Sequence, residues 1–142
     1  MRFEITDGPI ESDALYREVL KESDGAVVTF SGVVRDHSGD SRTDHLVYEA
    51  YPPMAEKKMA EIGGEIRNRW EVGDVAILHR TGRLEIGEIS VLIAVASPHR
   101  GDGFEAWRYA IDRLKEIVPI WKKEVTPEGE YWLEGPTAAA TT

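Results

Sequence analysis

Apolar and polar residues alternate along the 142-residue chain with two different spacings. Short alternating or β-branched apolar runs predict strands, whereas apolar residues three and four positions apart predict helices. The resulting order is strand, helix, strand, strand, helix, strand, strand, helix, strand, strand. The strands are predicted over residues 2–6, 26–35, 45–51, 75–79, 89–97, 120–125 and 130–133, and the helices over 13–21, 52–70 and 104–118.

Three of these segments carry specific structural expectations. Residues 26–35 (AVVTFSGVVR) are nearly all apolar, which predicts a central strand that is buried on both faces. In the second helix, Gly63 and Gly64 predict either a weak middle or a close approach by another backbone. The third helix is predicted to bury one apolar stripe, which consists of Phe104, Trp107, Ile111, Leu114 and Val118.

The mixture of hairpin-like neighbours and helices predicts an α+β fold with a mostly antiparallel or mixed sheet and about three helices. No repeat, heptad run or linker divides the chain, so residues 1–135 are expected to form a single domain. The tail, residues 136–142, has no large apolar side chain to bury and is expected to be disordered.

Composition narrows the possible functions. The chain has no cysteine, which excludes disulfides, thiolate metal sites and a cysteine nucleophile. Its 17 Lys and Arg against 26 Asp and Glu give a net charge of -9, which disfavours nucleic acid and anionic membranes as partners. No run approaches the roughly 20 apolar residues of a membrane span. The acidic first residues lack a signal-peptide core, so a cytoplasmic protein is expected.

Several familiar catalytic motifs are absent from the sequence. It contains no GxxxxGK[ST] phosphate loop, no GxGxxG turn and no GxSxG nucleophile elbow. Its four histidines do not pair at the spacing of metal ligands, so no metal site is expected, and no cofactor is expected either. His79 and Arg80, which precede Gly82, could be functional, but a structural turn is the favoured interpretation. The four tryptophans are interpreted as core or interface packing.

Cationic residues are better candidates for a site. The segment SPHRGDG (97–103) follows a predicted buried strand and precedes a helix, so His99, Arg100 and free backbone N–H groups could face an anion. A glycine-containing connection with two solvated side chains explains the segment equally well. Arg35 ends a predicted strand before the polar loop 36–44, where it could clamp a ligand or merely end the strand.

Two lysines near the C-terminus lie beside apolar residues. Lys115 adjoins the apolar stripe of the third helix, and Lys122 follows Pro119 on a predicted strand. Partial loss of solvation would lower the pKa of such a lysine and make it a nucleophile or an acid–base group. A charged lysine would instead bind phosphate. Composition alone favours a third possibility, a lysine whose charged end stays in water. These residues by themselves do not define a reaction.

The sequence is nevertheless similar to a known family over most of its length. Five blocks resemble, in the same order, segments of the catalytic (large) subunit of molybdopterin synthase. The block from residue 97 is the longest and the most specific. The blocks are GAVVTFSGVVRDH (25–37), YEAYPPMAEKKM (48–59), AILHRTGRLEIGE (76–88), SPHRGDGFEAWRYAIDRLKEIVPIWKKE (97–124) and EGEYWLEG (128–135).

This resemblance implies an α/β hammerhead-type fold and a homodimer. Each end of the dimer would bind a small ubiquitin-like sulfur-carrier subunit whose C-terminal Gly-Gly bears a thiocarboxylate, which gives a heterotetramer. The implied activity is that of a sulfurtransferase in molybdenum cofactor biosynthesis. It would move sulfur from the thiocarboxylate to cyclic pyranopterin monophosphate (precursor Z) and form the dithiolene of molybdopterin. Sulfur that arrives on a partner agrees with the absence of cysteine.

The resemblance also assigns site residues. The family's catalytic lysines correspond to Lys115, as the essential amine, and Lys122, as a charge that stabilises the thiocarboxylate or the substrate. Its substrate-binding positions correspond to Arg35, His99 and Arg100, and the last two are expected to reach the pocket of the neighbouring protomer. The flanking residues expected to line the site are Val33, Val34, Lys123 and Glu124.

Two other functions are compatible with such a domain. One is a non-catalytic module that only holds the carrier, which the presence of all five matched basic residues disfavours. The other is a different enzyme on a phosphorylated heterocycle, such as a hydrolase. A hydrolase would need an activated water, and the sequence predicts neither a metal site nor a pair of carboxylates to supply one.

Overall fold

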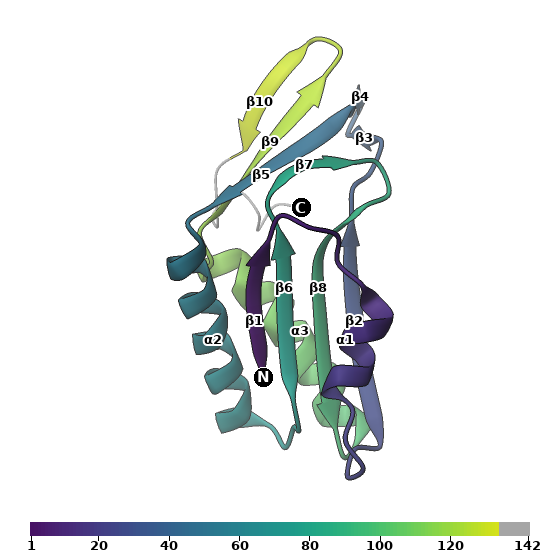
Figure 1. The fold of residues 1–142 in the computed structure, drawn as a ribbon, viewed down its shortest axis with the longest axis vertical. Coiled ribbons are helices and arrows are strands. Elements are labelled where there is room, and N and C mark those ends of the chain that lie inside the picture. Colours follow the sequence, from purple (N-terminus) through teal and green to yellow (C-terminus); the bar gives the residue numbers. More distant parts are fainter. Residues whose placement is uncertain (134–142) are drawn as a thin grey trace.

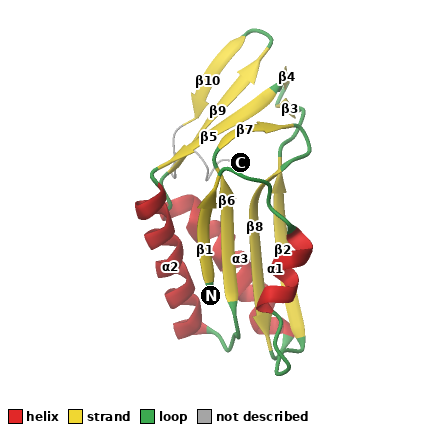
Figure 2. Cartoon of the chain, in the orientation of Figure 1, coloured by secondary structure: helices red, strands yellow, loops and turns green. Residues whose placement is uncertain are grey.

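The computed structural model describes residues 1–133, which form three helices and ten strands (Figure 2). The α+β class and the number of helices are confirmed, whereas the predicted tail at 136–142 lies outside the described residues. Among the described residues, no helix has the length and apolar character needed to cross a bilayer. The elements are β1 (Arg2–Thr6), α1 (Ser12–Val19), β2 (Ala26–Val33), β3 (His37–Ser38), β4 (Ser41–Arg42), β5 (His45–Ala50), α2 (Pro52–Arg69), β6 (Val75–Arg80), β7 (Gly82–Glu85), β8 (Ile89–Ser97), α3 (Arg100–Ile117), β9 (Ile120–Thr126) and β10 (Gly129–Leu133).

The strands form two four-stranded sheets and a small hairpin of β3 with β4. The first sheet has the order β1-β6-β8-β2, in which β1 and β6 are parallel and the other pairs are antiparallel. The second sheet has the order β10-β9-β5-β7 and is antiparallel. Figure 1 shows the second sheet lying across the upper ends of β6 and β2. The predicted mixture of parallel and antiparallel strands is therefore confirmed, and the two sheets meet at the ends of these strands.

Helices cover both faces of the first sheet (Figure 1). On one face α2 and α3 bury Ile62, Ile66 and Leu114, and on the other face α1 buries Leu15 and Val19. The central strands β6 and β8 are buried along nearly their whole length. Because packing on both faces immobilises these strands, their ends form a rigid base for a site.

The prediction that residues 26–35 form a central strand is wrong. β2 has β8 as its one neighbour in the sheet, and its exposure alternates toward Val33, which is 50% exposed. The strand also ends at Val33, next to an irregularity in register between Gly32 and Val33. An apolar run gives the same sequence signal in a central strand as in an edge strand, because residue types do not report the number of strand neighbours.

The buried face of α3 differs in part from the predicted stripe. Its innermost residues are the small Gly103, Ala106 and Ala110, together with Leu114. Phe104 is 54% exposed, so its predicted burial is wrong. Small side chains allow the helix to lie close to the sheet, and a pattern based on large apolar residues overlooks them.

The two glycines in α2 have different surroundings. A β-carbon at Gly63 would overlap the ring of Phe3 on β1, whereas one at Gly64 would meet open space. The close neighbour of the helix is therefore a side chain and not a backbone.

We expect Gly63→Ala to lower the free energy of unfolding by about 1–3 kcal/mol, because the added methyl group overpacks the contact with Phe3. Gly64→Ala is the matched control and should raise it by about 0.5–1 kcal/mol, because alanine loses less backbone entropy in a helix. Urea denaturation measures both changes. Equal effects of the two substitutions would contradict the packing role of Gly63.

Candidate functional site

Three basic side chains meet where the second sheet crosses the first. Lys115 comes from the last turn of α3, Lys122 from β9, and Arg35 from the segment directly after β2. The charge of Arg35 acts on both lysines, and the charge of Lys115 acts on Lys122. Because charges shift one another's pKa mainly at short range, the fold brings these three predicted residues together.

Burial is the main reason why the pKa of each lysine lies below the ordinary lysine value. For Lys115, Arg35 lowers the pKa further and Asp112 opposes the shift. For Lys122, the charges of Lys115 and Arg35 lower the pKa further and Glu124 opposes the shift. A lysine with a lowered pKa gives up its proton more readily, which an amine must do to act as a nucleophile or a general base. Neither amine is a fully solvated surface charge.

Neighbouring residues of β9 point to opposite faces of the second sheet. Glu124 shares the face of Lys122, and its buried carboxylate accepts a hydrogen bond of 2.6 Å from Thr43 Oγ1. Lys123 points to the other face, where its Nζ lies 5.4 Å from the ring centroid of the exposed Trp132. Glu124 is thus part of the basic cluster, whereas Lys123 is separated from it by the sheet.

The two predicted valines occupy different environments. Val33 ends β2 and is half exposed, whereas Val34 is 4% exposed. The backbone N–H of Val34 donates to the carbonyl of Glu88 at 3.0 Å, and its own carbonyl accepts from the N–H of Gly87 at 2.9 Å. Val34 therefore anchors the backbone from which Arg35 emerges.

His99 and Arg100 lie at the opposite end of α3. His99 precedes the helix, Arg100 is its first residue, and both side chains are exposed. Ser97 Oγ donates to the carbonyl of His99 at 2.7 Å and fixes this junction. Lys115 follows Arg100 by 15 residues, which corresponds to about 22 Å along a helix. One protomer therefore does not bring these two residues to the lysines.

Two rings, the buried His79 and the half-buried Tyr48, border the lysines and were not predicted as site residues. His79 and Arg80 belong to β6, so their interpretation as a turn is wrong. His79 is 5% exposed, and the ring centroid of Tyr48 lies 4.9 Å from its own. Tyr48 is also the cross-strand partner of Lys122. A lone histidine in an apolar strand shows no sequence pattern, so only the meeting of the two sheets identifies it.

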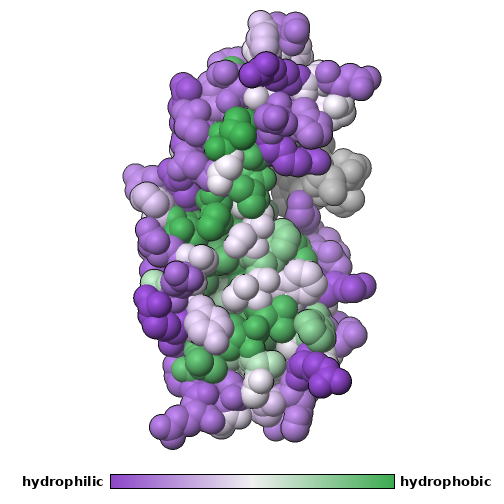
Figure 3. Space-filling model, turned by 90° about the vertical axis from the view of Figure 1, so that its right-hand side faces the viewer, coloured by the Kyte–Doolittle hydropathy of each residue, from purple (hydrophilic) through white to green (hydrophobic). Residues whose placement is uncertain are grey.

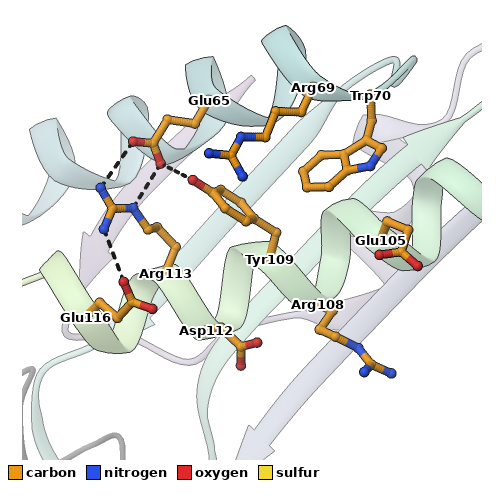
Figure 4. A pocket seen from close by; sticks show the side chains of 9 residues that line it. All are labelled: Glu65, Arg69, Trp70, Glu105, Arg108, Tyr109, Asp112, Arg113 and Glu116. Carbon is orange, nitrogen blue, oxygen red and sulfur yellow. Dashed lines mark hydrogen bonds and ion pairs between the residues drawn. The ribbon is translucent and has the colours of Figure 1, made fainter.

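A separate hollow of about 510 Å³ lies between α2 and α3 (Figure 4). Some of its charged groups already have partners: Arg113 pairs with Glu65 at 3.0 Å, and Arg69 lies over the ring of Tyr109. None of the predicted site residues lines it. Within residues 1–133, no group of three His, Cys, Asp or Glu side chains has the arrangement of a metal site.

Known proteins share both the sequence and the fold. The family model described as "MoaE protein" matches residues 5–117. The molybdopterin synthase catalytic subunit of Halalkalibacterium halodurans is 54% identical over 132 residues, which cover 93% of this chain and 85% of that protein. The crystal structure of molybdopterin synthase from Staphylococcus aureus has a TM-score of 0.89 at 50% identity, covering 93% of this chain and 96% of that chain.

A more distant structure shows the extent of the shared fold. The complex of subunits 1 and 2 of molybdopterin-converting factor from Helicobacter pylori 26695 has a TM-score of 0.76 at 21% identity, covering 91% of this chain and 88% of that chain. At that identity the likeness concerns the fold alone. The resemblance predicted from the five sequence blocks is confirmed by the family match and by the high identity over nearly the whole chain. The chain belongs to the MoaE protein family, whose members include the catalytic subunits of molybdopterin synthase.

Proposed function

We propose that this chain is the sulfur-transferring subunit of molybdopterin synthase. It takes sulfur from the C-terminal thiocarboxylate of a small carrier subunit and gives it to cyclic pyranopterin monophosphate. The observation that carries this proposal is the convergence of the exposed Arg35 with two half-buried lysines, Lys115 and Lys122, in an acidic, cysteine-free chain. The named activity of its close relatives supports the same conclusion.

The basic cluster suits the chemistry of this transfer. Each transfer forms a carbon–sulfur bond on the pterin and breaks the carbon–sulfur bond of the thiocarboxylate, whose acyl carbon takes an oxygen from water and leaves as a carboxylate. At one pterin side-chain carbon the sulfur replaces the phosphate oxygen as the cyclic phosphate opens, and at the other carbon the replaced oxygen leaves as water. Two transfers therefore give the dithiolene. Arg35 and Lys122 stabilise the negative charges of the thiocarboxylate and phosphate. Lys115, whose pKa burial lowers, moves protons at the reacting carbon.

A second copy of the chain completes the site in this proposal. β2 presents eight residues without a charge or a proline at a sheet edge, and stable proteins cover such edges. Val33 of this strand is exposed. Phe104 is also exposed, and it lies near the strand because its neighbour Gly103 packs against Val28. Figure 3 views the molecule from this side and shows apolar surface along its middle. A homodimer that pairs along β2 would cover this surface.

Pairing along β2 would also bring the separated site residues together. In a two-fold antiparallel pair with full overlap, Ala26 of one copy lies opposite Val33 of the other. On β8, Ala26 pairs with Ser97, and His99 and Arg100 come shortly after Ser97. Arg35 comes shortly after Val33, at the other end of β2. The dimer therefore carries His99 and Arg100 of one copy toward the basic cluster of the other, where Arg100 binds the substrate phosphate.

The carrier subunit is the other partner in this proposal, and two carriers with the dimer give a heterotetramer. The Helicobacter pylori structure, which shares this fold, is a complex of subunits 1 and 2 of molybdopterin-converting factor, and it motivates this part of the proposal. A cytoplasmic location is part of the same proposal, because the substrate is a charged, water-soluble phosphate.

The test is a reconstituted reaction. The full chain is mixed with a thiocarboxylated carrier and cyclic pyranopterin monophosphate, and molybdopterin is measured as its fluorescent oxidation product. We expect product only when all three components are present. A bound carrier without product would overturn the proposal in favour of a non-catalytic module that holds the carrier.

A further inference from the structure

His79 is a buried titratable side chain that the proposed reaction leaves without a role. It lies near the end of β6, and its Nδ1 is 2.8 Å from the backbone oxygen of Arg80. A carbonyl oxygen can only accept, so Nδ1 carries the proton, and in the neutral ring Nε2 is left as an acceptor. The backbone of β6 therefore selects the tautomer of this imidazole.

The ring of Tyr48 also contacts the imidazole of His79. The two ring planes meet at 69° in an edge-on contact. The Tyr48 hydroxyl shares a hydrogen bond with Ser90, and Ser90 Oγ donates its own proton to the carbonyl of Gly32 at 3.2 Å. These contacts fix the orientation of His79 without using its Nε2.

Both lysines of the basic cluster lie close to this imidazole. Lys122 is directly opposite Tyr48 across β5 and β9, and such pairs place their side chains next to each other on one face. The charges of Lys115 and Lys122 also act on His79. Burial, with these charges adding to it, lowers the pKa of His79 to about 4 although the bond to the Arg80 carbonyl opposes the shift. The ring is therefore neutral at pH 7.

We propose that His79 is a positioning residue for Lys122, whose ammonium donates a hydrogen bond to the fixed, neutral Nε2 of the imidazole when the site is loaded. The catalytic consequence of this inference rests on the proposed function. A carboxylate at the same place would also hold the ammonium, but it would raise the lysine pKa and cancel the positive charge that the anionic reactants need. A neutral imidazole orients the amine and leaves its charge in place.

The charges around the cluster explain why the ring must stay neutral. Tyr48 adds no charge, because burial raises the pKa of its hydroxyl. Arg80 pairs with Glu88 at 2.7 Å. A protonated His79 would add a fourth positive charge to a cluster that already holds three. The charged groups acting in this cluster are Lys115 and Asp112 of α3, Lys122 and Glu124 of β9, and Arg35 after β2.

The first test needs neither a variant nor an assay. Nitrogen NMR of the imidazole rings in the full chain reports which nitrogen of His79 carries the proton. We expect a proton on Nδ1, an acceptor at Nε2 and no titration between about pH 5 and 8. A proton on Nε2, or titration within that range, would overturn the proposal.

The second test compares His79→Phe, which removes the acceptor, with His79→Gln, which supplies a neutral one. With cyclic pyranopterin monophosphate bound, lysine side-chain NMR should show the pKa of Lys122 falling by about one unit in the phenylalanine variant, because the ammonium loses its acceptor, and staying near wild type in the glutamine variant. His45→Phe, on the opposite face of β5 from Tyr48, is the matched control and should leave the titration unchanged.

In the reconstituted assay, His79→Phe should lower kcat about tenfold with an unchanged KM for the pterin substrate, and His79→Gln should restore most of the loss. Equal losses in both variants would show that the histidine only packs, and would overturn the proposal. If the wild-type chain makes no product at all, the proposed function fails, whereas the tautomer and the lysine titration still decide the role of His79.

Discussion

Lys115→Ala is expected to abolish molybdopterin formation, with a loss of about 100-fold or more, as for removal of an acid–base group at a reacting centre. The fold and the dimer should persist, because the side chain lies at the edge of the buried face of α3 and Leu114 supplies the main packing there. The reconstituted assay measures the loss, and circular dichroism and size-exclusion chromatography check the structure. Near-full turnover would contradict the role of Lys115.

Two further variants separate the possible causes of this loss. Lys57→Ala removes an exposed lysine from α2 and is the matched control, which should keep wild-type activity. Lys115→Arg keeps the positive charge but cannot lose its proton at any working pH. It should remain inactive if the amine moves a proton, and recover activity if only a charge is required.

Mixing Lys115→Ala protomers with Arg100→Ala protomers is expected to restore activity that neither variant has alone. In the proposed dimer each site takes Lys115 from one copy and Arg100 from the other, so a mixed dimer contains one intact site. Random exchange makes half of the dimers mixed, which should recover about a quarter of the wild-type activity. The measurement is turnover after denaturation and joint refolding of the two variants.

Arg100→Ala alone should weaken binding of the precursor, which a titration of the dimer with cyclic pyranopterin monophosphate measures. Differently tagged protomers and native mass spectrometry show whether mixed dimers form. No recovery in a sample that contains them would contradict a site shared between copies. Activity in the mixture would not arise if both residues served the same site within one protomer, because every protomer then carries one defect.

The candidate site was predictable from sequence only in part. The similarity of residues 97–124 to a known family assigned roles to Lys115 and Lys122, and the structure brings these two together with Arg35. Whether those lysines were solvated or partly buried was open, because burial depends on β5 and α3 meeting at the end of the first sheet. No sequence pattern marked His79, since its neighbours Tyr48 and Lys122 lie on other strands.

The sequence by itself determined which reactive side chains the protein has and most of its helices and strands. A chain without cysteine cannot supply the sulfur, and the apolar spacing predicted the three helices and most of the strands correctly. Residue order does not determine strand order, so only the tertiary structure showed β2 at the sheet edge. It also showed Arg100 about 22 Å from Lys115 along one helix. Both findings concern distances between segments that are set by packing, and they are the physical reason why a second copy of the chain is needed to complete the proposed site.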